Sequence, residues 1–265
     1  MQDRYVGDIG DFAKYALLRR LAGLPGQRPM RVAVVWCLFP DEIHNSDGRH
    51  ISYLGRAEFA GLDDELRVIL REIVHSGSRC ISAVAAGGVL PCATVFYDAP
   101  AASPKIARLT RTERARHRLI WLENCLGHTD GGELVFFDPD NGFEVPSVPK
   151  HHPNAGKYIY WDELAPFWSR GQTLLIYHHL NRTMPAARQV RELAIRIRAE
   201  FDGAMVRPLV FRRGSCRVFW LVFRCSGLGT EMERRALELL NSAWSMHFHP
   251  ARWHDRDQIL TLSAR

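Results

Sequence analysis

Apolar runs alternate with amphipathic segments along most of the chain. The runs are short and rich in branched and aromatic residues, which is typical of parallel strands buried on both faces of a sheet. Between them, apolar positions recur at helical spacing and turn-forming residues stand at the ends, which predicts helices. We expect strands at 31–39, 93–98, 134–138 and 173–179, and helices at 10–22, 63–77, 110–128 and 185–201.

The last third of the chain has a different pattern. Strands at 204–212 and 216–225 are separated only by a tight turn and therefore predict a hairpin. The segment 80–91 is rich in small residues and fits either a helix or a poor strand. Strands that alternate with helices predict an α/β, Rossmann-like, mostly parallel sheet with helices on both faces, closed here by the antiparallel hairpin at one edge. We expect one domain, 1–265, with a polar loop inserted after the first strand at about 40–57.

Composition narrows the class of protein. The chain has 265 residues, of which 46% are hydrophobic, enough for a large core. Its six cysteines are widely spaced, without a close pair, and predict reduced thiols rather than a disulfide framework. No apolar run approaches the roughly 20 residues of a membrane span, and the first residues are mixed and acidic, unlike a signal peptide. We therefore expect a cytoplasmic protein that does not cross a membrane.

The charge balance favours an acidic partner. The net charge is +6 and the pI about 9.2, which suits binding to nucleic acid or a nucleotide. Arginine greatly outnumbers lysine and is spread along the chain without a dense basic tract. A genome rich in G and C would produce the same excess of arginine, so the charge alone leaves both interpretations open.

Polar residues follow each predicted parallel strand. In an open parallel sheet, ligands bind at the carboxyl ends of the strands, which lie along one edge. The loops at that edge are 41–50, Asp98, 138–141 and 178–182. We expect them to form one pocket, in which several carboxylates repel one another and at least one pKa rises.

The predicted substrate contacts come from the first and last of these loops. Two adjacent histidines end the last parallel strand, and neighbouring residues of a strand face opposite sides, so at most one of His178 and His179 can serve the pocket. Arg182 can contact the substrate, or it can simply cap a helix or pair with a carboxylate. The predicted contacts are Asp41, His44, Asp47, His178 and Arg182.

The segment 138–141, Asp-Pro-Asp-Asn, is the strongest candidate for chemistry. A proline and a following glycine indicate a tight turn, from which Asp138, Asp140 and Asn141 project at a strand end. Their oxygens can accept hydrogen bonds from an exocyclic amine and orient it for reaction. An Asx turn that merely ends the strand explains the same residues. If the segment is catalytic, Asp138→Ala should remove activity and leave folding nearly intact.

Two segments resemble one enzyme family. The first, GDIGDFAKY, is similar to the G-N-x-x-D-x-x-K-H element of the bacterial large-subunit rRNA adenine amino-methyltransferases, the RlmJ-like family. Gly7, Asp11 and Lys14 match at unbroken spacing, whereas Asp8 replaces the family's Asn. The second segment, FFDPDNGFE, is similar to that family's D-P-P-Y-E segment. The order of elements also agrees over most of the chain, and the late hairpin resembles that of class I methyltransferases.

This resemblance implies an S-adenosylmethionine-dependent amino-methyltransferase that acts on nucleic acid or a nucleotide-like substrate. It implies that Asp138, with Asp140 or Asn141, orients the target amine. The chain differs from the family in the turn after the first strand, where FPDEIHNSDGRH replaces a glycine-rich loop, and at Asn141, which replaces an aromatic residue that stacks on a flipped base. The cofactor contacts that the resemblance implies are Gly7, Asp8, Asp11, Lys14 and Asp98.

The replacement loop supports a second interpretation. Its carboxylates, amide and imidazoles can hold a divalent metal ion for phosphoester hydrolysis, with Asp138 and Asp140 as further ligands. Polar loops without a metal have the same composition, and the chain contains no H-x-x-x-H or H-E-x-x-H pair. A metal-dependent hydrolase or nuclease and a non-catalytic binding module therefore stay as alternatives. The loop ligands in question are Asp41, Glu42, His44, Asn45, Asp47 and His50.

Overall fold

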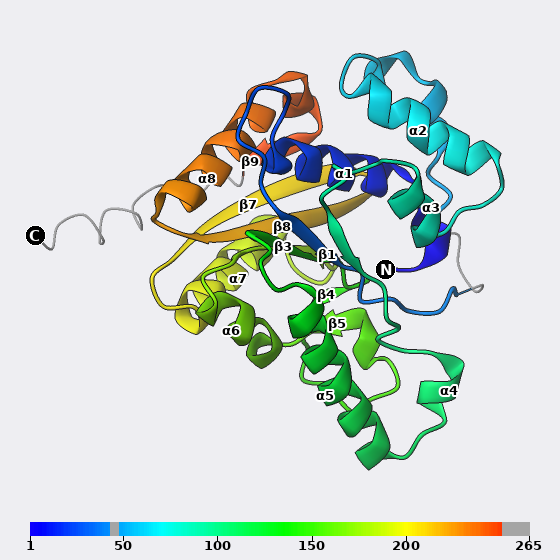
Figure 1. The fold of residues 1–265 in the computed structure, drawn as a ribbon, viewed down its shortest axis with the longest axis vertical. Helices are drawn as coiled ribbons and strands as arrows, with labels where there is room; N and C mark the ends of the chain where they lie inside the picture. Colours follow the sequence, from blue (N-terminus) through cyan, green and yellow to red (C-terminus); the bar gives the residue numbers. More distant parts are fainter. Residues whose placement is uncertain (43–47, 251–265) are drawn as a thin grey trace, which may run out of the picture.

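The computed structural model describes residues 1–42 and 48–250. In that part of the chain, seven strands form one mixed sheet in the order β2-β1-β3-β6-β8-β7-β9. Helices cover both faces of this sheet (Figure 1). The chain therefore has the α/β, Rossmann-like architecture that the alternation of strand and helix patterns predicts.

Four strands of the sheet run parallel. They are β2 (Val95–Tyr97), β1 (Val32–Val35), β3 (Leu134–Phe137) and β6 (Thr173–His179). The predicted side-by-side arrangement of β1, β3 and β6 is confirmed by their register, in which Val32 is level with Leu134 and Leu134 with Thr173. The first strand is shorter than the expected 31–39, because the backbone turns at Cys37, whose φ is +41°.

The C-terminal hairpin is inserted into the sheet. β7 (Ala204–Arg213) and β8 (Ser215–Arg224) form the predicted hairpin around Gly214, which has a φ of +71°. β8 pairs antiparallel with β6, and the short strand β9 (Phe248–Pro250) pairs antiparallel with β7. The expected edge position of the hairpin is therefore wrong, because β9 covers the outer side of β7.

The sheet separates two apolar cores. Along β1, Val32 and Val34 face one core, whereas Ala33 and Val35 face the other. Figure 1 shows one group of helices on each side of the sheet. The first core is closed by α1 (Ile9–Ala22), α2 (Asp64–His75) and α8 (Gly227–Leu240), and the second by α5 (Arg111–His128), α6 (Trp161–Ser169) and α7 (Ala186–Glu200).

Local capping fixes where these helices begin. Asp8 caps α1, because its carboxylate accepts a hydrogen bond from the Asp11 amide at 2.9 Å. Thr110 begins α5 with a capping box. Pro185 is the N-cap of α7, so this helix begins one residue after the expected start at 185.

The remaining segments connect these elements. The ambiguous stretch 80–91 contains a helix, α3 (Ile81–Ala86), and no strand is assigned to it. The polar loop after β1 includes residues 43–47, which lie outside the described part of the chain. The other short elements are η1 (Asp3–Tyr5), η2 (Ser52–Gly55), η3 (Ala57–Phe59), α4 (Pro104–Ala107), β4 (Gly142–Phe143), η4 (Ala155–Lys157), β5 (Tyr158–Ile159) and η5 (Ala243–Met246).

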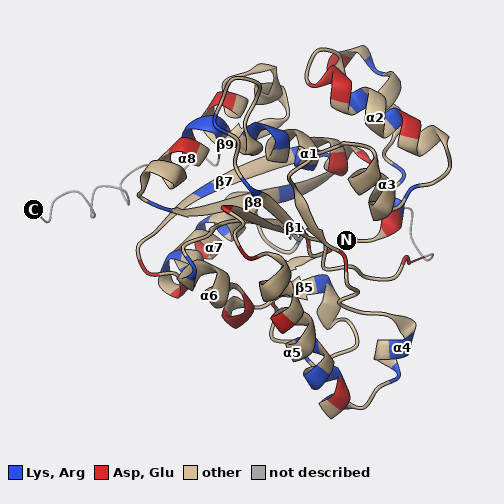
Figure 2. Ribbon diagram, in the orientation of Figure 1, with Lys and Arg blue, Asp and Glu red and all other residues tan. Residues whose placement is uncertain are grey.

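Charged residues of both signs lie interspersed along α2, α5 and α8 (Figure 2). The positive net charge is therefore not concentrated on any one of these helices. Among the helices of residues 1–42 and 48–250, none has the length and apolar character needed to cross a membrane.

Candidate functional site

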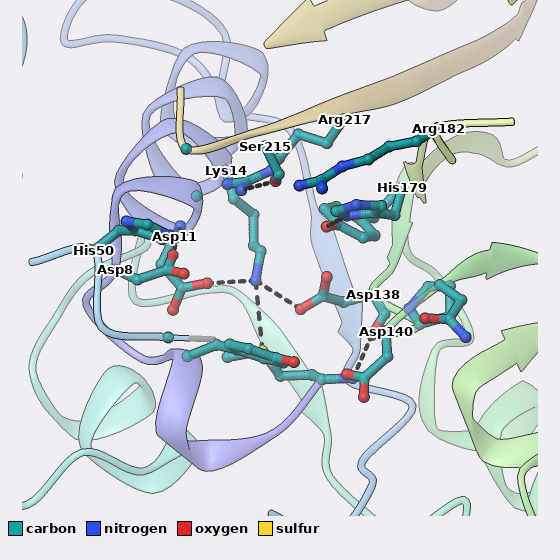
Figure 3. Close-up of a pocket in the computed structure, with 18 residues that line it drawn as sticks. Asp8, Asp11, Lys14, His50, Asp138, Asp140, His179, Arg182, Ser215 and Arg217 are labelled. Atoms are coloured by element: carbon teal, nitrogen blue, oxygen red, sulfur yellow. Dashed lines mark hydrogen bonds and ion pairs between the residues drawn. The ribbon is translucent and has the colours of Figure 1, made fainter. Parts of the chain in front are cut away.

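A cavity of about 510 Å³ opens at the carboxyl ends of β3 and β6. Five stretches that are far apart in the sequence enclose it: the first residues with the start of α1, the end of the loop after β1 at Gly48 and His50, the loop after β3, the end of β6 and the β7–β8 turn (Figure 3). Carboxylates line it from the first two stretches, and basic groups line it from β6 and the hairpin. The expectation that strand ends gather polar residues at one edge therefore holds for β3 and β6.

Lys14 lies at the centre of this cavity. Its ammonium nitrogen is 2.6 Å from Asp11 Oδ1 and 2.7 Å from Asp138 Oδ2. All three side chains are almost completely buried, with residue exposures of 2–3%. Asp11 lies one turn before Lys14 on α1, whereas Asp138 follows β3, 124 positions further along the chain. Two distant segments therefore meet in one ionic cluster, which we call the Lys14 cluster: Asp11, Lys14 and Asp138.

Burial and pairing act in opposite directions on these groups. Burial raises the pKa of Asp138 above its ordinary value, although Lys14 partly offsets this. The pKa of Asp11 is also raised, and burial is again the main cause. Burial alone would lower the pKa of Lys14, but the two carboxylates outweigh it and raise that pKa. Because two carboxylates share one cation, the cluster carries an excess negative charge when both are ionised.

The backbone at Gly7 supports this cluster from behind. Asp11 Oδ2 accepts hydrogen bonds from the Tyr15 hydroxyl at 3.1 Å and from the Gly7 amide at 3.3 Å. Gly7 has a φ of +78°, and a Cβ there would come within 2.5 Å of Val74 Cγ2. Gly7 therefore orients Asp11 but does not itself line the cavity.

Asp140 belongs to a second polar group beside the Lys14 cluster. The amino group of Met1 is 2.9 Å from Asp140 Oδ1, and it donates to the carbonyls of Asp138 at 2.9 Å and Cys37 at 3.3 Å. The Gln2 amide donates to Asp140 Oδ2 at 2.6 Å. Burial alone would raise the pKa of Asp140, but the amino group and Gln2 outweigh it and lower that pKa. Asp140 is therefore ionised at neutral pH.

The structure brings together most of the predicted site residues. Asp98 is exposed directly after β2 and is not among the residues that line the cavity. Asp41 is also exposed, and it accepts a hydrogen bond from the Arg4 amide at 3.1 Å. The predicted single pocket therefore includes neither Asp98 nor Asp41, and His44 and Asp47 lie outside the described residues. The predicted residues that line it are Asp8, Asp11, Lys14, Asp138, Asp140, Asn141 and Arg182.

His178 and His179 face opposite sides of β6, as their adjacency requires. His179 lines the cavity. The ring of His178 lies against Gly142, and its Nδ1 accepts a hydrogen bond from the Phe143 amide at 3.2 Å. Burial lowers the pKa of His178 to about 4, so this ring is a neutral acceptor. Of the two histidines, the structure therefore places His179, and not the expected His178, at the cavity.

The β7–β8 hairpin lines the cavity, although none of its residues was predicted to belong to the site. Arg217 is 6% exposed and lines the cavity from β8, and its Nη2 donates to Ser215 Oγ at 2.5 Å. Apolar residues fill the rest of the buried stretch of β8, from Val218 to Phe223. An arginine stands at each end of this run, and Arg217, at the end beside the tight hairpin turn, was the signal that could have identified this position.

The carboxylates of the cavity are arranged around a lysine. Among residues 1–42 and 48–250, no group of three or more His, Cys, Asp or Glu side chains is placed to hold a metal ion. The ammonium of Lys14 lies between the carboxylates of Asp11 and Asp138, where a cation would be expected. A divalent ion at this position would have to displace Lys14.

Comparison of the chain with protein families, curated proteins and solved structures finds no match. A fold of this class hosts many unrelated activities, so the fold alone does not indicate one. The function must therefore be inferred from the chemistry of the cavity and from the two segments that line it.

Proposed function

We propose that the protein is an S-adenosylmethionine-dependent amino-methyltransferase that acts on nucleic acid or a nucleotide-like substrate. The observation that carries this proposal is the contact of 2.7 Å between Lys14 and Asp138. It joins the two segments that resemble the amino-methyltransferases, GDIGDFAKY and FFDPDNGFE, although they lie far apart in the sequence. A chance resemblance of two separate segments would not require them to share one cavity.

The order of the strands also supports the proposal. β8 runs antiparallel between β6 and β7, next to the last of the parallel strands. A late hairpin beside a parallel sheet is the feature by which the sequence resembles class I methyltransferases. Ligands of such sheets bind at the carboxyl ends of the parallel strands, where this cavity opens.

The start of α1 fits the amino-acid end of the cofactor. Lys14 offers an ammonium for a carboxylate, and Asp8 and Asp11 offer carboxylates for an amine. When bound, S-adenosylmethionine supplies the methyl group. The ribose end fits less well, because Asp98 lies outside the cavity and the non-glycine residue Cys37 occupies the turn after β1. We therefore assign cofactor contacts only to Asp8, Asp11 and Lys14.

Asp140 and Asn141 fit the orientation of a target amine. Both line the cavity, and the lowered pKa keeps Asp140 ionised. A carboxylate and a side-chain amide oxygen can each accept one N–H of an exocyclic amine. Two such bonds direct the nitrogen lone pair away from both acceptors and increase the electron density on the nitrogen. Each oxygen of Asp140 already has one partner, the Met1 amino group or Gln2, and keeps a second lone pair for the amine. In this proposal Asp138 is a positioning residue, because it holds the Lys14 ammonium and not the substrate.

Thermal unfolding with S-adenosylhomocysteine tests the cofactor assignment. A ligand that binds only the native state stabilises it by about 2.7 kcal/mol at 100 times its Kd. We expect this stabilisation to raise the Tm of the native protein. The Tm of the Lys14→Met variant should rise much less. Each protein is compared with the same protein without ligand. Asp130→Asn is the matched control, because it changes an exposed carboxylate outside the cavity.

Transfer of a labelled methyl group tests the reaction. The acceptors are nucleotides and a single-stranded oligonucleotide, and Asp140→Asn should lower the rate at least tenfold with little change in cofactor binding. If millimolar S-adenosylhomocysteine has no effect and Mn²⁺ raises the Tm, the metal-dependent hydrolase is favoured. If the cofactor binds but no acceptor is methylated, a binding module is favoured.

A further inference from the structure

Arg217 is a buried cation without a carboxylate partner. Its residue exposure is 6%, its Nη2 donates to the neutral Ser215 hydroxyl, and its Nε has no hydrogen-bond partner. Within residues 1–42 and 48–250, no acidic side chain forms an ion pair with it. Removing a guanidinium from water is costly unless a charged or hydrogen-bonding partner replaces the solvent.

The backbone of α1 makes room for this guanidinium. A Cβ at Gly10 would lie 1.8 Å from Arg217 Nη1, so any side chain at this position would displace the tip of the arginine. Arg217 is held from the other side by Ser215, at the start of the same strand. The guanidinium is therefore fixed at the wall of the cavity by glycine on one element and serine on another.

A second arginine reaches the same end of the cavity. Arg182 follows β6, is exposed, and has no hydrogen bond or ion pair with a described residue. Figure 3 shows Arg182 and His179 on the same side of the cavity as Arg217 and Ser215. Basic groups at β6 and the hairpin form a basic end of the cavity, and α1 with the loop after β3 forms an acidic end. The two ends meet at Gly10, where both Arg217 Nη1 and Asp8 Oδ1 approach the backbone of α1.

We propose that the basic end, formed by Arg217, Arg182, His179 and Ser215, binds the phosphate group of a nucleotide unit. Guanidinium groups present several N–H donors in a plane and match the oxygens of a phosphate. A cavity of about 510 Å³ is within the range that holds a ligand of nucleotide size. The inference rests on the proposed function in one respect: the reacting amine of the nucleotide would lie at the acidic end.

Calorimetric titration with matched ligand pairs tests the phosphate subsite. AMP is compared with adenosine, and UMP with uridine, on the full chain at low salt without cofactor. A phosphate bound by two arginines should make each nucleotide bind at least about tenfold more tightly than its nucleoside. A short single-stranded oligonucleotide, titrated in parallel, shows whether the phosphate belongs to a free nucleotide or to a strand.

Three variants show which residues bind the phosphate. The measured quantity is the phosphate gain, the factor by which a nucleotide binds more tightly than its nucleoside. Arg217→Met should remove most of it, and Arg182→Gln should reduce it. Gly10→Ala should also remove most of it, because the new methyl group displaces the guanidinium while alanine suits a helix interior. Arg198→Gln is the control, because it removes an exposed positive charge of α7 that does not line the cavity. It should leave the gain unchanged.

The phosphate preference and the proposed reaction can fail separately. The inference is overturned if AMP and UMP bind no better than their nucleosides, or if the gain persists in both Arg217→Met and Gly10→Ala. A phosphate gain without any effect of S-adenosylhomocysteine leaves the subsite standing and removes the methyltransferase. Methyl transfer to a nucleoside, with no phosphate gain, supports the methyltransferase and removes the phosphate subsite.

Discussion

Two buried ionic clusters lie on opposite sides of the same sheet, and only one of them lines the cavity. The Lys14 cluster joins α1 to the end of β3. The other cluster joins Arg118 of α5 to Glu163 of α6, and these two residues are 3% and 1% exposed. Both clusters have a similar degree of burial, so burial alone does not distinguish a site from a structural pair.

The Arg118–Glu163 pair is closed and balanced. Arg118 Nε and Nη2 each lie 2.7 Å from a different oxygen of Glu163. The same guanidinium also donates to the carbonyls of Ala155 at 3.4 Å and Tyr158 at 2.9 Å, and two aromatic rings pack against it. Arg118 is the close cation of Glu163, with Lys150 further away at 4.0 Å, and the remaining donors of Arg118 are directed at backbone oxygens.

The Lys14 cluster is open and unbalanced. One cation serves two carboxylates, and all three side chains line the cavity. Its pKa values reflect this, because those of Asp11 and Asp138 are raised in spite of the neighbouring lysine. The comparison indicates that excess charge beside a cavity, and not burial of charge as such, marks the group that is available to a ligand.

The largest expected effect is the loss of the closed pair. Arg118→Met leaves the buried Glu163 with only the half-buried Lys150 ammonium at 4.0 Å, and we expect the free energy of unfolding to fall by about 3 kcal/mol. Urea denaturation measures this loss. The double variant Arg118→Met/Glu163→Gln should regain a large part of it, and the stabilisation by ligands of the cavity should be unchanged. A loss in ligand affinity would contradict the purely structural role of this pair.

Lys14→Met should cost about 3 kcal/mol at pH 7, with a stronger dependence on pH than Arg118→Met. A carboxyl group whose pKa is raised by folding favours the folded state at low pH, and this contribution is lost as the pH rises through the folded pKa. Without Lys14, two such groups are released from their cation. The loss should therefore shrink as the pH falls from 7 toward 4, and urea midpoints at four pH values would show it. A loss that is equal at all pH values would contradict the ionised state of both carboxylates.

Asp138→Asn should be milder than the equivalent change in the closed pair. The variant loses a charge-assisted hydrogen bond to Lys14, but it also removes the excess negative charge, so we expect a loss of about 1 kcal/mol. Glu163→Gln leaves Arg118 without its carboxylate partner and should cost several times more. Equal losses in the two variants would show that the Lys14 cluster is as balanced as the other.

The sequence predicts those residues of the site that directly follow a parallel strand. β3 and β6 are neighbours, so the polar residues that follow them, Asp138 and Arg182 among them, meet in one cavity. Asp98 also follows a parallel strand, but β2 is separated from β3 by β1, so its end lies further along the edge. The rule about strand ends gives the edge correctly, but it does not give the position along the edge, which depends on strand order.

Other features depend on contacts that no local pattern encodes. The three-residue strand β9 exists because β7 pairs with it, and strands this short carry almost no signal of their own. The burial of Asp138 depends on Lys14 and on the first residues of the chain, which cover the end of β3. From the sequence, Asp138 was expected to be a strand-end residue that contributes little to folding. It is 3% exposed and paired with Lys14, so we now expect its removal to have a measurable cost.

The smallest effect expected at neutral pH is that of His178, on the face of β6 turned away from the cavity, and it grows as the pH falls. Its pKa is about 4 in the folded protein, against an ordinary value of 6.5. Above pH 6.5 the ring is neutral in both states, and its contribution to stability is complete. As the pH falls from 6.5 to 4, the unfolded chain binds the proton first, so stability is lost. His178→Gln keeps an acceptor for the Phe143 amide and removes this titration. We expect the variant to lose about 1–2 kcal/mol less than the native protein between pH 6.5 and 4, after allowance for solvent screening of this half-buried ring. A fall in pH therefore lowers the stability of the native protein through His178, whereas it reduces the stability loss caused by Lys14→Met. In the double variant, the two changes in the pH dependence of stability should add.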